Sequence, residues 1–173
     1  MKNTNIRLKA GALALMAGLY STGPAAETQS GVAIATVITP LVITNLVTMD
    51  FTTIAAGSAG GVLTMDAAGA VTVLSGDANV IGAGAGTALA FDISGETAQA
   101  YTLTVGNGVL SDGLAIPNTM AITTDAVVAP SLTIAAQTVT VSGDLTVGAS
   151  QAAGSYSTAN AGGTPITITA NYN

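Results

Sequence analysis

The chain has 173 residues, with nine Asp and Glu, three Lys and Arg, no His and no Cys, and its formal net charge is −6. Zinc and thiol chemistry have no ligands or nucleophiles without His and Cys, so both are excluded. All three basic residues, Lys2, Arg7 and Lys9, lie at the start of the chain. We therefore expect no nucleic acid partner and no anionic membrane surface, since both are bound through Lys and Arg.

The N-terminus has the three parts of a secretory signal peptide. The basic start is followed by a mostly apolar run, Ala10–Tyr20, and then by small residues at Gly23, Ala25 and Ala26. That run has 11 residues, whereas a membrane-spanning helix needs about 20. The sequence therefore predicts a signal peptide over residues 1–26, cleaved after Ala25 or Ala26, and export to the periplasm, the outer surface or the exterior.

Residues 27–173 are predicted to form one domain. Without the signal peptide the chain keeps nine carboxylates and no cationic side chain, so its side-chain charge is −9. A chain of this size buries roughly 68–70% of its unfolded surface. It can therefore fold without disulfides.

Short runs of alternating or β-branched residues, separated by Gly, Asp, Asn and Pro, predict an all-β fold. The first extended stretch is Val32–Ile38 and Leu41–Val47, bent at Pro40, which has no N–H for a central strand. Met49–Ile54 follows and ends in the glycine-rich turn Gly57–Gly61. The other predicted strands are Val62–Met65, Ala70–Leu74, Ala88–Ile93, Tyr101–Val105, Met120–Thr123, Leu132–Ile134, Thr138–Val141 and Leu145–Val147.

The last predicted strand has the clearest period of two. Ile166, Ile168, Ala170 and Tyr172 point to one face, and the polar residues between them point to the other. No convincing helical period follows the signal peptide, and Ala149–Ala153 allows a single helical turn at most. With no repeat and no linker, the pattern favours a single all-β domain.

The residues that carry chemistry are few. Two carboxylates can hydrolyse glycosidic bonds, and the nearest pair in sequence is Asp92 and Glu96. A polar strand end followed by a turn explains the same two residues, and we prefer this interpretation. Gly82–Gly86 lacks the helix and the Lys of a phosphate-binding loop and predicts a flexible turn. Calcium accepts acids near glycine turns, but no D-x-D-x-D spacing occurs. We expect no enzymatic activity, no cofactor and no metal site.

Unprotected sheet edges are a further expected feature. Monomeric β-proteins commonly guard their edges with charge, above all with Lys, and no Lys follows Lys9. Either the edges are occupied by another copy through strand addition, or bulges, short edges, Pro40 and Pro165 protect them. The sequence leaves both explanations open.

Four segments carry a family resemblance: Thr39–Thr44, Met49–Gly57, Leu145–Tyr156 and Asn171–Asn173. They resemble a family of exported Gram-negative proteins, domain of unknown function 4402, over essentially the whole chain after the signal peptide. That family is similar in turn to spore-coat-protein-U-like and chaperone–usher pilin subunits. The resemblance implies an immunoglobulin-like (pilin-like) antiparallel β-sandwich and assembly into fibres by donor-strand exchange. Thr52 departs from the pattern, since such families usually have Gly after the Asp-Phe pair.

The resemblance also implies which residues make contacts between subunits. Gly154 and Tyr172 resemble the end of a pilin that a periplasmic chaperone binds, although the stretch 158–163 lengthens their spacing. Gly31–Thr36 is either a donor strand or the first strand of a self-contained sandwich. The strand-exchange contacts that we predict are Val32, Ile34, Ile166, Ile168 and Tyr172.

The leading hypothesis is a non-catalytic structural protein, a cell-surface or fibre subunit. It would associate through strand edges with itself or with other fibre subunits, and a periplasmic chaperone is a further expected partner. The second hypothesis is a secreted or periplasmic binding module that recognises carbohydrate or protein through its loops. An acid-pair hydrolase ranks third.

Trypsin cleaves after Lys and Arg, and none occurs beyond Lys9. We therefore expect trypsin to leave the exported protein uncut, both folded and in urea, when the digest is followed by mass spectrometry. Chymotrypsin, which cuts at Tyr, Phe and Leu, is the positive control. A tryptic fragment that begins beyond residue 26 would contradict this expectation.

Overall fold

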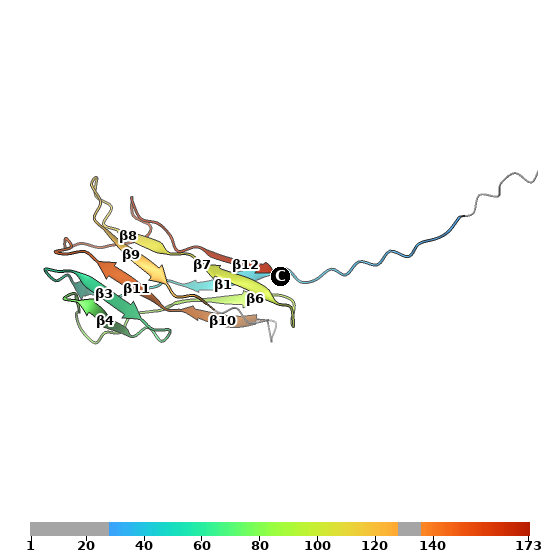
Figure 1. Ribbon diagram of the computed structural model, residues 1–173, viewed down its shortest axis with the longest axis horizontal. Coiled ribbons are helices and arrows are strands. Elements are labelled where there is room, and N and C mark those ends of the chain that lie inside the picture. The colour runs from blue at the N-terminus through green and yellow to red at the C-terminus, as the bar shows by residue number, and fades with distance from the viewer. Residues whose placement is uncertain (1–27, 128–135) are drawn as a thin grey trace, which may run out of the picture. The chain divides into compact units, whose positions relative to one another are not determined.

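The computed structural model describes residues 28–127 and 136–173 (Figure 1). The predicted signal peptide and the predicted strand Leu132–Ile134 lie outside the described residues. The chain divides into two units, Met1–Thr36 and Val37–Asn173. All regular structure among the described residues is strand, paired antiparallel, so the predicted all-β class is confirmed and the helical turn at Ala149–Ala153 is absent.

Residues 28–41 form no strand, so the strand predicted over Val32–Ile38 is wrong. A strand needs a hydrogen-bonded neighbour, and the ladders of the described chain begin at Val42. The β-branched pattern of this segment is present, but its backbone pairs with no other described residue in a ladder.

One core lies between a three-stranded and a two-stranded sheet. In the first sheet β6 (Leu89–Ser94) lies between β1 (Val42–Val47) and β10 (Ala136–Val141). In the second, β7 (Tyr101–Val105) pairs with β12 (Ile168–Tyr172). Inward-facing side chains of both sheets form one buried cluster: Leu89, Phe91, Ile93, Tyr101, Leu103, Val139 and Val141.

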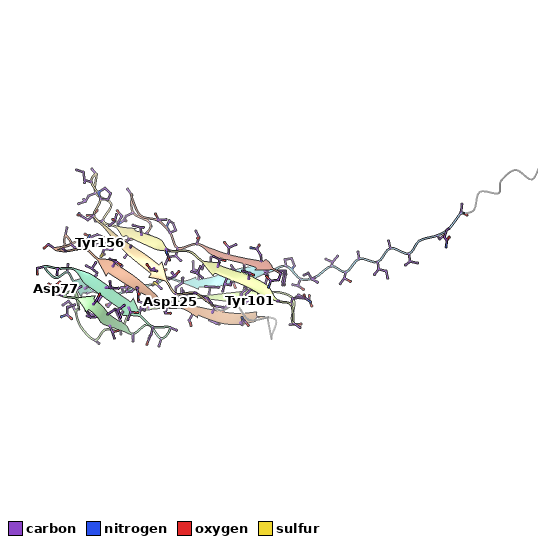
Figure 2. All side chains as sticks on the ribbon, viewed as in Figure 1. Asp77, Tyr101, Asp125 and Tyr156 are labelled. Atoms are coloured by element: carbon purple, nitrogen blue, oxygen red, sulfur yellow. The ribbon has the colours of Figure 1, made fainter. Side chains whose placement is uncertain are left out.

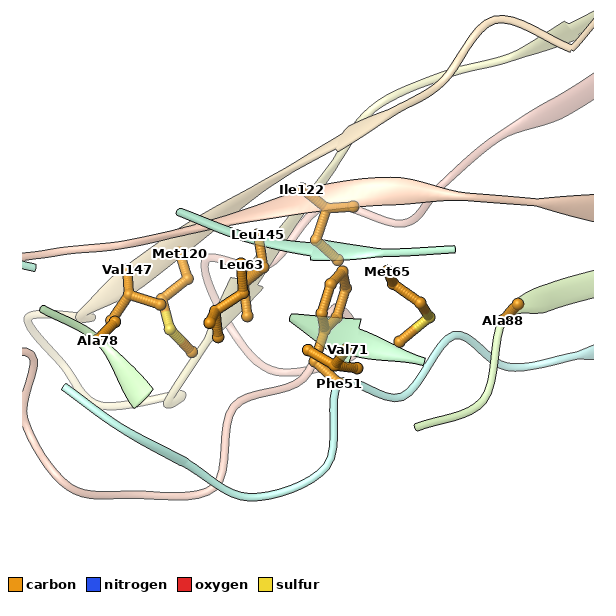
Figure 3. Packing of buried hydrophobic residues seen from close by; sticks show 10 residues of the cluster. All are labelled: Phe51, Leu63, Met65, Val71, Ala78, Ala88, Met120, Ile122, Leu145 and Val147. Atoms are coloured by element: carbon orange, nitrogen blue, oxygen red, sulfur yellow. The ribbon is translucent and has the colours of Figure 1, made fainter. Parts of the chain in front are cut away.

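A second core covers one face of a five-stranded sheet. Its strands, in spatial order, are β4 (Val71–Gly76), β3 (Gly61–Met65), β11 (Gly143–Val147), β9 (Thr119–Thr124) and β8 (Gly108–Ser111). A small pair, β2 (Ile54–Ala55) and β5 (Asn79–Val80), lies outside this sheet. Figure 3 shows the buried cluster: Phe51, Leu63, Met65, Val71, Ala78, Ala88, Met120, Ile122, Leu145 and Val147.

Two of the connections between the cores are very short. Only Ser142 separates β10 from β11, and only Gly106 and Asn107 separate β7 from β8. In each case the chain passes from a strand of one sheet to a strand of another through only one or two residues. Met49 and Ile166 pack against both clusters. The two cores are therefore continuous inside the unit Val37–Asn173.

The strand predicted over Met49–Ile54 is largely wrong, and the reason is local. An Asp50 carboxylate oxygen accepts a hydrogen bond from the Thr52 N–H at 2.8 Å, and Thr52 has a φ of 60°. This side-chain turn competes with a strand ladder, so only the Asp50–Thr87 bridge and β2 form. β5 and β8 were not predicted, because their sequences are short and rich in Gly, Asn and Ser.

We expect Thr52→Gly to stabilise the domain. A left-handed conformation costs an L-residue about 1–2 kcal/mol, and glycine loses about 0.5–1 kcal/mol in the unfolded chain, so the net gain is about 0.5–1 kcal/mol. Thr53 is also exposed but has no positive φ, so Thr53→Gly is the matched control and is expected to destabilise. Urea unfolding measures both. A Thr52→Gly protein no more stable than wild type would contradict the account of strain.

Two carboxylates hold loops through neutral donors. Asp77 accepts hydrogen bonds from the Ala59 N–H and the Ser58 hydroxyl, and a Cβ on Gly57 would lie 2.0 Å from its Oδ1. Asp112 accepts from the Asn118 side-chain amide and from two backbone N–H groups. The Ala59 N–H lowers the pKa of Asp77, and the Asn118 amide lowers the pKa of Asp112.

These lowered pKa values predict acid sensitivity. A carboxyl whose pKa is lowered by folding stabilises the fold above its unfolded pKa of about 3.9, and this is lost as pH falls through the folded value. We expect the free energy of unfolding to fall below about pH 4, with a shallower fall in Asp112→Asn. Urea unfolding at several pH values measures both slopes. An identical acid dependence in the two proteins would contradict the role of Asp112.

Candidate functional site: an open seam between two strand edges

Among the described strands of the first core, β1, β10, β7 and β12 each have one unpaired side, and two of these edges border the same hollow. β1 pairs with β6 on one side only, and β12 pairs with β7 on one side only. Neither strand has a second neighbour among the described residues. Such edges carry backbone N–H and C=O groups that are available to pair with another strand.

A hollow lies between these edges. It has a volume of about 340 Å³ and is lined by Ile43, Thr44 and Leu46 from β1 and by Ile166 and Ile168 from the other edge. Ile43, Ile166 and Ile168 also pack against the buried cluster of the first core. The hollow is therefore an opening onto that core.

The hollow continues as a larger one of about 690 Å³. This larger hollow shares Leu46, Ile166 and Ile168 with the first and extends to Met49 and Tyr156. A third hollow, of about 380 Å³, continues along residues 49–54 and 154–156, with core residues in its lining. We call the whole groove the seam: its walls are residues 43–54 and residues 154–168.

The lining of the seam is mainly apolar in its first two hollows and evenly polar and apolar in the third. Leu110 and Ile122 belong to the five-stranded sheet and line both the second and the third hollow, so the seam reaches the second core as well. Asp50 is the charged residue of these linings. No buried side-chain N or O atom of the described chain is without a hydrogen-bond partner. The seam thus presents apolar side chains along its first two hollows, with Asp50 and hydroxyl side chains among them.

A cluster of hydrogen bonds joins the two edges at one end, and we call it the clasp. The Tyr172 hydroxyl donates to the Thr39 carbonyl at 2.8 Å and accepts from the Glu96 N–H at 2.6 Å. A Glu96 carboxylate oxygen accepts from the Thr39 N–H at 3.2 Å and from its hydroxyl at 3.1 Å. The clasp fixes the point at which the chain enters β1 beside the last strand.

The domain that contains the seam and the clasp matches a known family model. The model named "domain of unknown function (DUF4402)" matches residues 41–172, which include both edges of the seam. The chain belongs to the DUF4402 family. Searches of curated proteins and of solved structures gave no match for this chain.

The predicted contacts of this DUF4402 domain separate into two groups. Ile166 and Ile168 both line the seam. Tyr172 packs against the first core and binds in the clasp, so it does not line the hollows. Val32 and Ile34 lie in the unit Met1–Thr36 and are each 89% exposed. Of the five predicted contacts, the three C-terminal residues therefore lie close to the seam or the clasp, whereas Val32 and Ile34 are exposed.

Sequence analysis did not identify the β1 wall of the seam. Leu46 is 63% exposed although it lies in a strand, and Val42 and Val47 are exposed too. Consecutive apolar residues in β1, VITNLV, were the available signal. Such a run is typical of a strand covered on both faces, and here only one face is covered.

Asp92 and Glu96, the two carboxylates considered for hydrolysis, each accept hydrogen bonds within the fold. Asp92 in β6 accepts a hydrogen bond from the Thr138 hydroxyl, and Glu96 beyond the end of β6 binds in the clasp. The described residues hold no group of three metal-ligating side chains and no helix that could cross a membrane.

Tyr156 lies in the seam. Its hydroxyl donates to the Ala152 carbonyl and accepts from the Gln151 side chain, and Figure 2 shows it far along the domain from Tyr101.

Proposed function

We propose that this DUF4402 protein is a non-catalytic exported structural protein, a cell-surface or fibre subunit that associates with copies of itself through its strand edges. The observation that supports this proposal is the seam, an apolar groove between two unpaired edges. We further propose that the fold is an immunoglobulin-like, pilin-like sandwich. In this proposal the seam is the place of a strand that the domain lacks.

The energetics favour a strand as the occupant. An added strand supplies backbone hydrogen bonds to an edge and places alternate side chains in the groove. Burying one Val, Leu or Ile side chain contributes about 1.5–3 kcal/mol. Three or four such side chains, added to the cover gained by Leu46, Ile166 and Ile168, offset much of the cost of association, about 4–15 kcal/mol.

A binding module for carbohydrate is less well supported. Sugar recognition relies on polar groups placed to meet hydroxyls, and the hydroxyl of Tyr156, the aromatic residue of the seam hollows, is bound by neighbouring residues. The apolar lining suits protein better than carbohydrate. A periplasmic chaperone stays a predicted partner, since it would meet the same unpaired edges.

Leu46→Asp tests the proposal. We expect the purified exported protein to form oligomers whose size rises with concentration, measured by size-exclusion chromatography with light scattering. Leu46→Asp places a carboxylate in the seam and should weaken association at least tenfold. Leu114, 61% exposed against 63% for Leu46, lies outside the seam hollows. Leu114→Asp is therefore the matched control and should associate as wild type does.

Two results would contradict the proposal. One is a wild-type protein that stays monomeric at all concentrations reached. The other is equal association of wild type and Leu46→Asp, with circular dichroism showing both folded. Filaments in negative-stain microscopy of wild type and their loss in Leu46→Asp would support the fibre form of the proposal.

A further inference from the structure

We infer that the loop between β8 and β9 inserts its apolar tip into an uncharged surface of zwitterionic phospholipid. The tip is residues 113–117, with the sequence Gly-Leu-Ala-Ile-Pro. This inference goes beyond the proposed function, because it assigns a lipid partner to a loop that lines none of the seam hollows. It does not depend on association between copies.

The tip exposes two large apolar side chains on a projecting loop. Ile116 is 88% exposed and Leu114 is 61% exposed, and Ala115 and Pro117 beside them are exposed too. Figure 1 shows the connection between β8 and β9 projecting beyond the ends of both strands. Contiguous exposed apolar residues mark an interaction site. A projecting tip fits a fluid layer that yields to it better than it fits a flat protein surface.

The backbone of the loop is suited to apolar surroundings, where an unbonded N–H group is costly. The Asp112 carboxylate accepts from the Leu114 and Asn118 N–H groups, each at 3.1 Å. The Asp112 N–H donates to the Asn118 carbonyl, and the Gly113 N–H donates to the Ser111 hydroxyl. Four N–H groups of the loop therefore have partners before it meets lipid.

These internal bonds favour lipid over a protein partner. A protein interface typically carries direct hydrogen bonds around its apolar centre. The loop has already used the N–H groups of Asp112, Gly113 and Leu114 within the fold. Lipid tails require no such donors.

The loop is held in one shape, which lowers the entropy cost of docking. Gly113 has a φ of 76°, and a Cβ on Gly162 of the neighbouring loop would lie 2.9 Å from the Pro117 Cγ. The Ser111 hydroxyl donates to the Ala161 carbonyl at 2.6 Å. Pro117 also has no N–H to leave unbonded. The apolar side chains are therefore presented on a preformed support.

Charge selects an uncharged lipid surface. Asp112 is the one acid between Glu96 and Asp125, so the tip itself is neutral. The exported chain carries nine carboxylates and no cationic side chain, so anionic lipids would repel it. Asp112 lies at the base of the loop, where its carboxylate stays in the headgroup layer and limits insertion to the tip.

A single Trp tests the insertion. The chain contains no Trp, so Ile116→Trp places one reporter at the tip. Leu74→Trp places one on β4, at a side chain that is 62% exposed. With phosphatidylcholine vesicles, we expect the emission of Ile116→Trp to shift to shorter wavelength and to be quenched by brominated lipid. Leu74→Trp should show neither change. If Ile116→Trp also shows neither change at millimolar lipid, the inference is wrong.

Co-sedimentation with the same vesicles measures binding without a Trp. Leu114→Asp/Ile116→Asp should bind more weakly than wild type, by about tenfold or more. Leu74→Asp is the matched control, since Leu74 is 62% exposed against 61% for Leu114. It should bind as wild type does, and so should Ile116→Leu, which keeps an apolar tip. Phosphatidylserine in the vesicles should weaken binding at low salt.

The outcomes separate this inference from the proposed function. Equal binding by wild type and Leu114→Asp/Ile116→Asp, with circular dichroism showing both folded, would overturn the inference, and so would tighter binding to phosphatidylserine vesicles. Association between copies should be unchanged in Leu114→Asp/Ile116→Asp, because neither residue lines the seam hollows. A wild-type protein that stays monomeric but inserts its tip would contradict the proposed function and leave the inference standing.

Discussion

No cationic side chain follows Lys9, and this absence affects both the contacts of the carboxylates and the strand edges. In the described regions, carboxylates accept hydrogen bonds from backbone N–H groups, hydroxyls and a side-chain amide. Asp66 accepts from the Ala68 and Ala70 N–H groups, and Asp125 accepts from the Ser142 hydroxyl. The acids are thus used to hold turns, where backbone donors are abundant. The strand edges receive no charged guard.

The same constraint sets the character of the seam. Two cores are built by strands that pass from one sheet to another at Ser142 and at Gly106–Asn107, and both cores open onto one groove. An ordinary exposed edge would be protected by Lys. Here exposed apolar side chains such as Leu46 occupy the edge strand instead of Lys. An unprotected apolar edge promotes unwanted association of a monomer, whereas a protein that assembles can use it for pairing.

The clasp connects the fold to the proposed assembly. Tyr172 in the last strand, Glu96 after β6 and Thr39 before β1 come from distant parts of the sequence. Together they hold the chain at Thr39, just before β1, within the unit Val37–Asn173.

The sequence by itself determined the all-β class, most strand positions and the alternating face of β12, because a period of two and the turn residues are local properties. It also predicted that Ile166 and Ile168 belong to a contact surface. It could not determine that Thr52 interrupts a strand, since the competing hydrogen bond from Asp50 depends on a local conformation that propensity does not reveal. Nor could it show that residues 32–38 form no ladder with the described part of the chain, because pairing is a property of two segments. The tertiary structure alone decided that β1 and β12 face each other across a groove, since distant segments meet only when the chain packs.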